Sequence, residues 1–172
     1  TGIPSQIAEL LDTGEVDIGI AAMGPLPNNS RFHLEEFVAD TLTIFANVNH
    51  EVLELDAPTF EDLANYQWVV QRQPVVMRAH IETVMRSAGI DRIDIACETD
   101  VPSMTVEMVI GSDYLAMLPF FPICDRVAAG HIAPVPISIE GSARSLSFMY
   151  RNSSQLSPTL SAFLKHMRGC VG

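Results

Sequence analysis

Close to its start the chain reads Leu10-Leu11-Asp12-Thr13-Gly14-Glu15-Val16-Asp17-Ile18-Gly19-Ile20, the pattern of a helix end followed by a buried strand. Pro4 and Ser5 can open this helix, because Pro fits the first turn and a Ser hydroxyl accepts from an unpaired backbone N–H. Gly14 suits the left-handed position past a helix end, and residues 16–22 are typical of a strand buried on both faces. The helix is predicted to bury Ile7, Leu10 and Leu11. A helix that feeds such a strand belongs to an α/β repeat, so we expect a preceding strand that this chain does not contain.

The same alternation of strands and helices continues to the end of the chain. Strands are predicted at 32–38, 41–48, 67–70, 93–97, 114–118 and 145–150, and helices at 59–65, 77–88, 103–110, 123–129 and from 157 onward. In the helix at 77–88 an apolar stripe repeats at helical spacing, which suits either an internal core or a surface for a partner. Short connections between the elements favour an α/β fold with largely parallel strand pairing.

Composition excludes several classes of protein. With 172 residues and 48% hydrophobic content, the chain can bury a core as one domain or as two small lobes. No apolar run approaches the roughly 18 residues of a membrane span, and no signal-peptide pattern opens the chain. The net charge is −11 and no cluster of Lys or Arg occurs. Because nucleic-acid binding depends on neutralising phosphates, we do not expect this chain to bind DNA by itself.

Catalytic and metal-binding patterns are absent from the sequence. Cys97, Cys124 and Cys170 are odd in number and lack metal-ligand spacing, which favours reduced thiols in a cytoplasmic protein and leaves a redox switch as the alternative. The five histidines are scattered. There is no nucleophile elbow, phosphate-binding loop or dinucleotide fingerprint. The sequence therefore predicts no catalytic residues, no metal and no cofactor.

Polar side chains do gather at helix starts and strand ends. Open α/β sheets bind ligands outside the carboxyl ends of their strands, and helix starts can hold anions. Each residue alone could equally be a helix cap or a core residue, but all of them fall at the same kind of topological position. The candidate ligand-binding residues are Pro4, Ser5, Met23, Gln71, Arg72, Gln73, Pro102, Ser103 and Met104.

Several motifs in order along the chain resemble one known family. They are Leu11-x-x-Gly14-x-Val16-Asp17-Ile18-Gly19-Ile20, Phe37-Val38-Ala39-Asp40-Thr41-Leu42-Thr43-Ile44 followed by Asn49-His50, Phe60-Glu61-Asp62-Leu63, Tyr114-Leu115-Ala116-Met117-Leu118-Pro119 and Leu156-Ser157-Pro158. Together they resemble the effector-binding domain of LysR-type transcriptional regulators over nearly the whole chain. Each motif alone is weak, whereas their order and spacing are fairly specific.

The resemblance implies two Rossmann-like α/β lobes of the periplasmic-binding-protein type II kind, joined by two crossover strands. One lobe would hold residues 1–43 and 140–172, and the other residues 44–139. Family members begin with a winged helix-turn-helix and the domain's first strand and helix, which are missing here. A small organic effector would lie between the lobes, and Arg72 would pair with its carboxylate. The family also self-associates through lobe helices as homodimers or tetramers, for which the helix at 77–88 is a candidate.

Three functions therefore compete. The leading hypothesis is a non-enzymatic, cytoplasmic sensor domain whose DNA contacts depend on the missing N-terminal part. A free-standing periplasmic-type solute-binding protein of similar fold is the second. An enzyme on a related two-lobed scaffold is the third, and the lack of a nucleophile with its base disfavours it.

Overall fold

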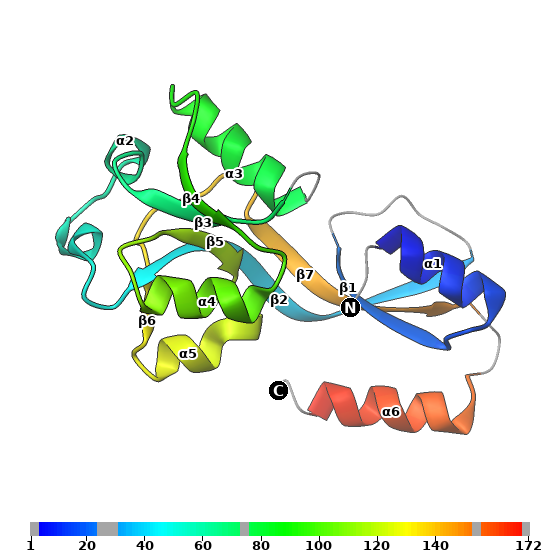
Figure 1. Ribbon diagram of the computed structural model, residues 1–172. Helices are drawn as coiled ribbons and strands as arrows, with labels where there is room; N and C mark the ends of the chain where they lie inside the picture. The colour runs from blue at the N-terminus through cyan, green and yellow to red at the C-terminus, as the bar shows by residue number, and fades with distance from the viewer. Residues whose placement is uncertain (1–3, 24–30, 73–75, 153–155, 170–172) are drawn as a thin grey trace. The chain divides into compact units, whose positions relative to one another are not determined.

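The computed structural model describes residues 4–23, 31–72, 76–152 and 156–169 of the chain (Figure 1). The chain forms two compact units. Unit 1 comprises Thr1–Asp40 and Ala143–Gly172, and unit 2 comprises Thr41–Ser142. The chain thus leaves unit 1 once, within a long strand, and returns to it once.

Unit 1 is a small sheet covered by one helix on each face (Figure 1). Its sheet has the order β1-β7-β2, and β1 runs antiparallel to β7, with Ile18 opposite Tyr150 and Met23 opposite Ser145. Side chains of α1 pack on one face of β1 and those of α6 on the other. The strand is therefore covered on both faces, but Ile18, Gly19 and Ile20 remain partly exposed and are not fully buried as predicted. The elements are α1 (Pro4–Thr13), β1 (Ile18–Met23), the first part of β2 (Phe32–Asn47), β7 (Ala143–Arg151) and α6 (Pro158–Gly169).

The end of α1 has the predicted geometry. Gly14 has a φ of 78°, its N–H donates to the carbonyl of Leu11 at 3.3 Å, and the N–H of Glu15 donates to the carbonyl of Leu10 at 3.0 Å. These two bonds are those of a Schellman motif. Leu11 is fully buried, but Leu10 is 37% exposed, so its predicted burial was wrong. One residue rotates a helix by about 100°, which turns Leu10 away from the stripe of Ile7 and Leu11.

Arg151 at the end of β7 fixes this helix end to the sheet. Its guanidinium donates to the carbonyls of Leu11 at 2.6 Å and Val16 at 3.0 Å, and to the carboxylate of Asp17 at 2.6 Å. One side chain therefore gives the Leu11 carbonyl a second donor beside the N–H of Gly14, and it also holds the residues that lead into β1.

Unit 2 is a sheet with the spatial order β4-β3-β5-β2-β6. Strands β3 and β4 are parallel, and β3 meets Leu115, just before β5, in a parallel bridge. The elements are the second part of β2, η1 (Glu51–Glu54), α2 (Phe60–Leu63), β3 (Gln67–Val70), α3 (Val76–Ser87), β4 (Asp94–Glu98), α4 (Pro102–Ile110), β5 (Ala116–Pro119), η2 (Phe121–Ile123), α5 (Cys124–Ala128) and β6 (Ile132–Pro134).

Helices cover both faces of the unit 2 sheet: α3 lies on one side, and α4 and α5 lie on the other (Figure 1). Along β3, Trp68 and Val70 belong to the α3 side and Val69 to the α4 side. Burial on both faces explains why this strand reads as a continuous apolar run. On α3, Ile81 and Met85 are 2% and 1% exposed, so the apolar stripe of this helix is core.

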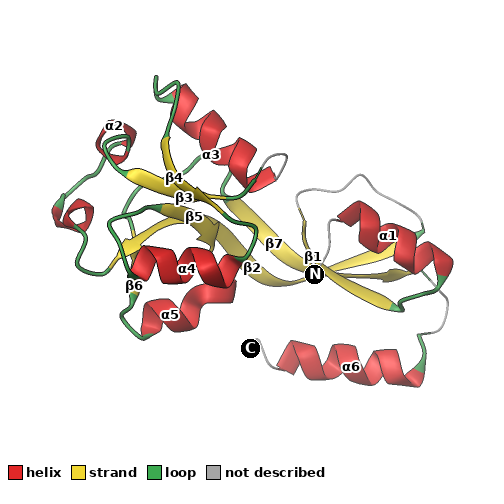
Figure 2. Cartoon of the chain, in the orientation of Figure 1, coloured by secondary structure: helices red, strands yellow, loops and turns green. Residues whose placement is uncertain are grey.

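Strand pairing differs from the prediction in two ways (Figure 2). Residues 32–38 and 41–48 were predicted as two strands but form one continuous strand, β2. Largely parallel pairing was also predicted, whereas β1–β7, β2–β5 and β2–β6 are antiparallel. The prediction rested on strands linked by crossover helices, but β7 is separated from β1 by the whole of unit 2 and reaches it from the opposite direction.

Candidate functional site

Three parallel strands of unit 2 end at one edge of its sheet, which we call the carboxyl edge. Gln71 follows β3, Asp100 lies two residues after β4, and Phe120 follows β5. Because β2 runs antiparallel to β5, its residue Thr41 lies at the same edge, where its carbonyl accepts from the N–H of Phe120 at 2.9 Å. Ligand sites of open α/β sheets lie outside such an edge.

Arg72 and Asp100 join the ends of β3 and β4 at this edge. The backbone N–H of Arg72 donates to Oδ1 of Asp100 at 3.1 Å, and Nε of its side chain lies 3.5 Å from Oδ2. The Arg72 side chain is 69% exposed. The contact with Asp100 uses the Nε side of the guanidinium, so its two terminal amino groups are in a position to donate to a ligand.

Beneath this pair, Arg78 on α3 is a buried cation. Its guanidinium donates to the carbonyl of Gln71 at 3.1 Å, to the carboxylate of Glu98 at 3.0 Å and to that of Glu82. Burial alone would lower the pKa of Arg78, but the hydrogen bonds to Glu82 and Glu98 outweigh it and raise the pKa above its ordinary value. Arg78 therefore remains charged and holds the last residues of β3 and β4 in place.

The first turn of α4 supplies backbone donors at the carboxyl edge. Its N-cap residue Val101 makes no side-chain capping bond, and Pro102 at the first helical position has no N–H to satisfy. The N–H groups of Ser103 and Met104 are next in the helix, at its positive end. Met104 is 53% exposed and Val101 is 50% exposed. This corner thus combines anion-binding donors with exposed apolar surface.

The structure brings together two of the predicted groups of site residues. Gln71 and Arg72 lie at the carboxyl edge with the first turn of α4, which contains Pro102, Ser103 and Met104. Pro4 and Ser5 are in the first turn of α1, and Met23 is the last residue of β1, all within unit 1. Gln73 lies outside the described residues.

Sequence reasoning missed three residues that shape the edge. Phe120, which is 37% exposed, lies two residues after the strand predicted at 114–118, so the rule that found Gln71 could also have found it. Asp100 lies just before the helix predicted at 103–110, and the sequence did not predict that it would be the partner of Arg72. Arg78 gave one local signal, its ion pair with Glu82 four residues along the helix, but nothing in the sequence indicates its reach to Gln71 and Glu98.

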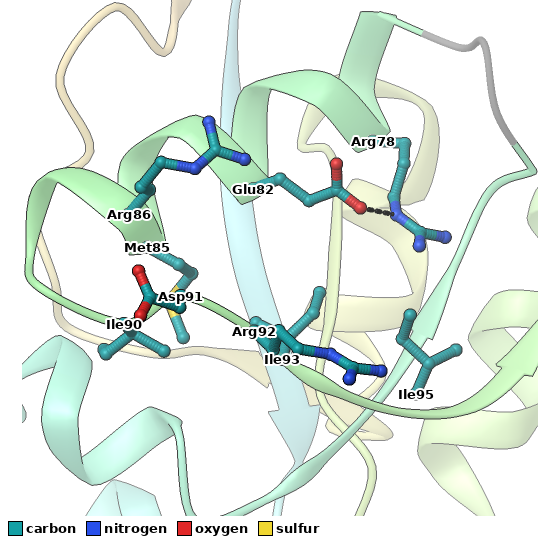
Figure 3. A pocket seen from close by; sticks show the side chains of 9 residues that line it. All are labelled: Arg78, Glu82, Met85, Arg86, Ile90, Asp91, Arg92, Ile93 and Ile95. Atoms are coloured by element: carbon teal, nitrogen blue, oxygen red, sulfur yellow. Dashed lines mark hydrogen bonds and ion pairs between the residues drawn. The ribbon is translucent and has the colours of Figure 1, made fainter.

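A hollow of unit 2 is lined by residues of α3, of β4 and of the connection between them (Figure 3). Its volume is about 240 Å³, and Met85 and Ile93 form part of its floor. Arg86 and Arg92 flank it, and neither takes part in the ion pairs formed between described residues. We call this hollow the α3–β4 groove.

Other kinds of site find no support in the described part of the chain. There, no three His, Cys, Asp or Glu side chains gather as a metal site would require. Cys97 and Cys124 are free thiols, and Cys170 lies outside the described residues. None of the helices described has the length and apolar character needed to cross a membrane.

Comparison with known proteins gives a consistent result. Residues 1–170 match the LysR substrate binding domain family. The chain is 22% identical over 165 residues to the HTH-type transcriptional regulator GalR of Pseudomonas putida, covering 96% of this chain and 41% of the relative. It is 27% identical over 125 residues to the HTH-type transcriptional regulator SsuR of Burkholderia cenocepacia, covering 70% of this chain and 40% of the relative. The chain thus spans about two fifths of the length of these curated relatives.

Solved structures share the fold. The regulatory domain of CcmR from Synechocystis PCC6803, in complex with 2-PG, superposes with a TM-score of 0.75 at 14% identity, covering 96% of this chain and 78% of that one. The effector binding domain of QuiR in complex with shikimate gives a TM-score of 0.69 at 16% identity, covering 99% of this chain and 78% of that one. The fold is therefore the mixed α/β regulatory-domain fold, similar to type II periplasmic binding proteins, and its family is not one of enzymes. The chain belongs to the LysR substrate binding domain family.

Proposed function

We propose that this chain is the effector-sensing domain of a LysR-type bacterial transcription regulator. It binds a small organic anion between two lobes, residues 1–43 with 140–172 and residues 44–139, and passes the lobe arrangement to a DNA-binding domain. Two compact units with bounds close to these lobes support the proposal. Two similar regulatory domains are described in complex with small organic molecules, 2-PG and shikimate. Such a regulator acts where the DNA is, in the bacterial cytoplasm.

The observation that carries the proposal is that Arg72, which contacts Asp100, lies at the same carboxyl edge as the start of α4. An exposed guanidinium offers a planar pair of donors that matches a carboxylate. Backbone N–H groups at the start of α4 add a second set of donors with the favourable end of the helix dipole. Asp100 lies beside Arg72 and orients it through Nε. In the proposed complex, Ser5 and Met23 complete the cleft from the other lobe.

Transmission of the signal would use the two places where the chain passes between units. The strand β2 crosses at Asp40–Thr41, and the return crosses at Ser142–Ala143. On the unit 2 side, the N–H of Leu42 donates to the carbonyl of Ser142 at 2.9 Å. On the unit 1 side, Arg144 donates to the fully buried carboxylate of Asp40 at 2.8 Å. An effector that binds one lobe arrangement more tightly shifts the population toward it.

Self-association is the second part of the proposal, and the α3–β4 groove is the surface that we assign to it. Arg86 and Arg92 lie beside the apolar side chains of the groove, which also contains the acidic residues Glu82 and Asp91. A surface of a second copy that carries carboxylates would complement the two arginines. The net charge of the chain is −11, so two arginines that form no ion pair with any described carboxylate are unusual here. The double variant Arg86→Glu and Arg92→Glu is expected to shift the sedimentation profile of the chain toward monomer, with Lys165→Glu on α6 as the matched charge control. An unchanged profile would remove this groove from the interface.

Effector binding is tested first by a thermal-shift screen against carboxylates, aromatic acids and sugar acids, because a ligand of the native state raises its apparent stability. Titration calorimetry with each hit then compares Arg72→Ala with Arg126→Ala, an exposed arginine of α5 that pairs with Glu107. Loss of a charge-assisted hydrogen bond costs about 1–3 kcal/mol, so Arg72→Ala is expected to weaken binding by roughly 5- to 150-fold and Arg126→Ala to leave it unchanged. Equal affinities in both variants would exclude Arg72 from the site.

A further inference from the structure

Exposed apolar side chains are concentrated at the carboxyl edge of unit 2. Among the described residues, eight large apolar side chains are more than a third exposed. Four of the eight belong to this edge, and we call them the apolar rim: Val101, Met104, Phe120 and Phe121. The other four are divided between α1, α6 and the surroundings of η1. Single exposed apolar residues are ordinary on a protein surface, whereas a group of them marks a binding surface.

The members of the apolar rim lie on the same side of the sheet. The ring of Phe120 stacks on that of Phe45 with centroids 6.2 Å apart, and Phe45 belongs to the core on the α4 side. The short helix η2, which begins with Phe121, leads into α5 on this side (Figure 1). Val101 and Met104 are three residues apart at the start of α4, so they are neighbours on the helix surface.

Arg72 lies between the two halves of the apolar rim. One half follows β4 and the other follows β5, and β3, which ends just before Gln71 and Arg72, runs between these two strands. Neighbouring strands are about 4.8 Å apart, so the ends of β4 and β5 lie about 10 Å from each other. A flat molecule of two fused rings can therefore contact both halves while its acidic group meets the guanidinium of Arg72.

The charges at this edge select a ligand with a single negative charge. Among residues 71–72, 98–104 and 119–121, Arg72 is the one Lys or Arg. Arg78 lies beneath them, but its side chain is buried and already engaged by Glu82 and Glu98. Asp100 lies 3.5 Å from Nε of Arg72, so a second negative group on the ligand would be repelled by this carboxylate without a further cation to balance it.

The apolar rim also disfavours a ligand that is rich in hydroxyl groups. A hydroxyl placed against these side chains loses its hydrogen bonds to water and gains no partner, which costs free energy. An aromatic ring placed there gains apolar contact, ring-to-ring contact with Phe120 and Phe121, and contact with the thioether of Met104. The edge therefore matches an aromatic body that carries one acidic group.

We propose that the effector of this chain is an aromatic monocarboxylate. Its carboxylate accepts hydrogen bonds from the terminal amino groups of Arg72, and its ring system lies on the apolar rim across the end of β3. This inference rests on the proposed function, because it assigns a chemical class to the ligand of the proposed effector site.

The test uses 2-naphthoate as the probe, with three counterparts that each change one property. Gluconate is a monocarboxylate with a hydroxyl-rich body, 2-naphthol has the rings without the carboxylate, and naphthalene-2,6-dicarboxylate has a second carboxylate. The methionine methyl signals of the isotopically labelled chain are followed by NMR, and Met104→Leu assigns the signal of Met104. We expect 2-naphthoate to shift this signal in a saturable way and to bind about tenfold or more tightly than each counterpart, the size of one charge-assisted bond or of a few methylene groups of apolar contact.

Two variants separate the two parts of the site, and titration calorimetry measures their affinities. Arg72→Ala is expected to weaken 2-naphthoate and gluconate alike, because both carry the carboxylate. Met104→Gln keeps the length of the side chain and makes its end polar, so it is expected to weaken 2-naphthoate by about fourfold or more, the size of one methyl group of apolar contact, and to spare gluconate. Leu10→Gln, at an exposed apolar residue of α1, is the matched control and should leave 2-naphthoate unchanged. The fluorescence of Trp68, the single tryptophan, shows before ligand is added whether unit 2 is folded in each variant.

Three outcomes would overturn the assignment and leave the proposed effector site standing: gluconate or the dicarboxylate binding as tightly as 2-naphthoate with loss of that binding in Arg72→Ala, or equal affinity for 2-naphthoate in Met104→Gln and the native chain. Binding of 2-naphthol as tight as that of 2-naphthoate would also overturn it, because the guanidinium would then select nothing. If none of the four compounds binds, the assignment is wrong, and the thermal-shift screen over the other acids decides separately whether the effector site exists.

Discussion

Gly19 in β1 has no room for a side chain, and this gives the sharpest stability prediction. It lies on the face of β1 that α1 covers, and a Cβ at this position would overlap Cγ2 of Ile7. Ile7 is 6% exposed and packs with Leu11, Ala21 and Met149 in the core beneath α1. Gly19→Ala therefore forces α1 and β1 apart, although alanine would otherwise suit a strand better than glycine.

The size of the effect follows from the packing on each side. Adding a methyl to a filled core costs about 1–3 kcal/mol, so Gly19→Ala is expected to lower the free energy of unfolding of unit 1 by that amount. Ile7→Ala removes Cγ2 and leaves a cavity, at a cost of about 2–5 kcal/mol. In the double variant the new methyl occupies space that Ile7 has vacated. The double variant is therefore expected to lose about 1–3 kcal/mol less than the sum of the two single variants.

Hydrogen exchange of the α1 and β1 amides measures this free energy for unit 1, and the fluorescence of Trp68 follows unit 2 as an internal control. The control is expected to show the same midpoint of urea unfolding in all four proteins. If the losses in free energy of unfolding caused by Gly19→Ala and Ile7→Ala add to within about 0.5 kcal/mol in the double variant, the two residues do not interact and the packing argument is refuted. The same conclusion follows if Gly19→Ala alone is neutral.

Three further predictions concern polar contacts. Arg168 donates to both carboxylate oxygens of Glu35 at 2.6 Å, and this hydrogen bonding lowers the pKa of Glu35 despite its partial burial. The stabilisation by this ion pair is complete above the ordinary pKa range of glutamate and is lost as the pH falls through the lowered pKa. Below about pH 5, the free energy of unfolding in urea should therefore depend less steeply on pH in Glu35→Gln than in the native chain. Equal slopes in the two proteins would disprove this. Thr59 and Asp62 form a capping box at α2, so Thr59→Ala should cost about 1 kcal/mol in the urea unfolding of unit 2 followed by Trp68, and no loss would contradict the cap. Arg78→Met should cost about 1–3 kcal/mol by the same measurement, with Arg78→Lys intermediate, and a neutral Arg78→Met would show that the buried cation holds neither strand end.

Local signals in the sequence identified most elements. Gly14 predicted the end of α1 because a left-handed residue after a helix is a property of a few neighbouring residues. The stripe on α3 predicted which side of that helix is buried for the same reason. Leu10 shows the limit of this reasoning, because an apolar residue at the edge of a stripe is placed by the neighbouring sheet and not by its own spacing.

Strand pairing could not be derived from such signals. The segment from Phe32 to Asn47 looked like two strands because polar residues interrupt its apolar pattern in the middle, where the chain passes from unit 1 to unit 2. Each half meets a different environment, so its pattern of burial changes while its backbone stays extended. The antiparallel pairing of β1 with β7 joins segments more than 120 residues apart, and neither segment carries information about the other.

At the carboxyl edge, the sequence predicted which residues lie together but not which contacts hold them in place. Gln71, Arg72 and the start of α4 were predicted because each follows a strand or opens a helix, and both are local features. The contact of Arg72 with Asp100 joins residues 28 positions apart and appears only when β3 and β4 are paired. This contact restrains the side chain of Arg72. An exposed arginine without contacts loses side-chain conformational entropy when it binds a ligand. An arginine whose backbone N–H and Nε already contact a carboxylate loses less of this entropy on binding. In the proposed effector site, the Asp100 carboxylate would therefore favour binding by preorganising the guanidinium of Arg72, although its charge opposes that of an anionic effector.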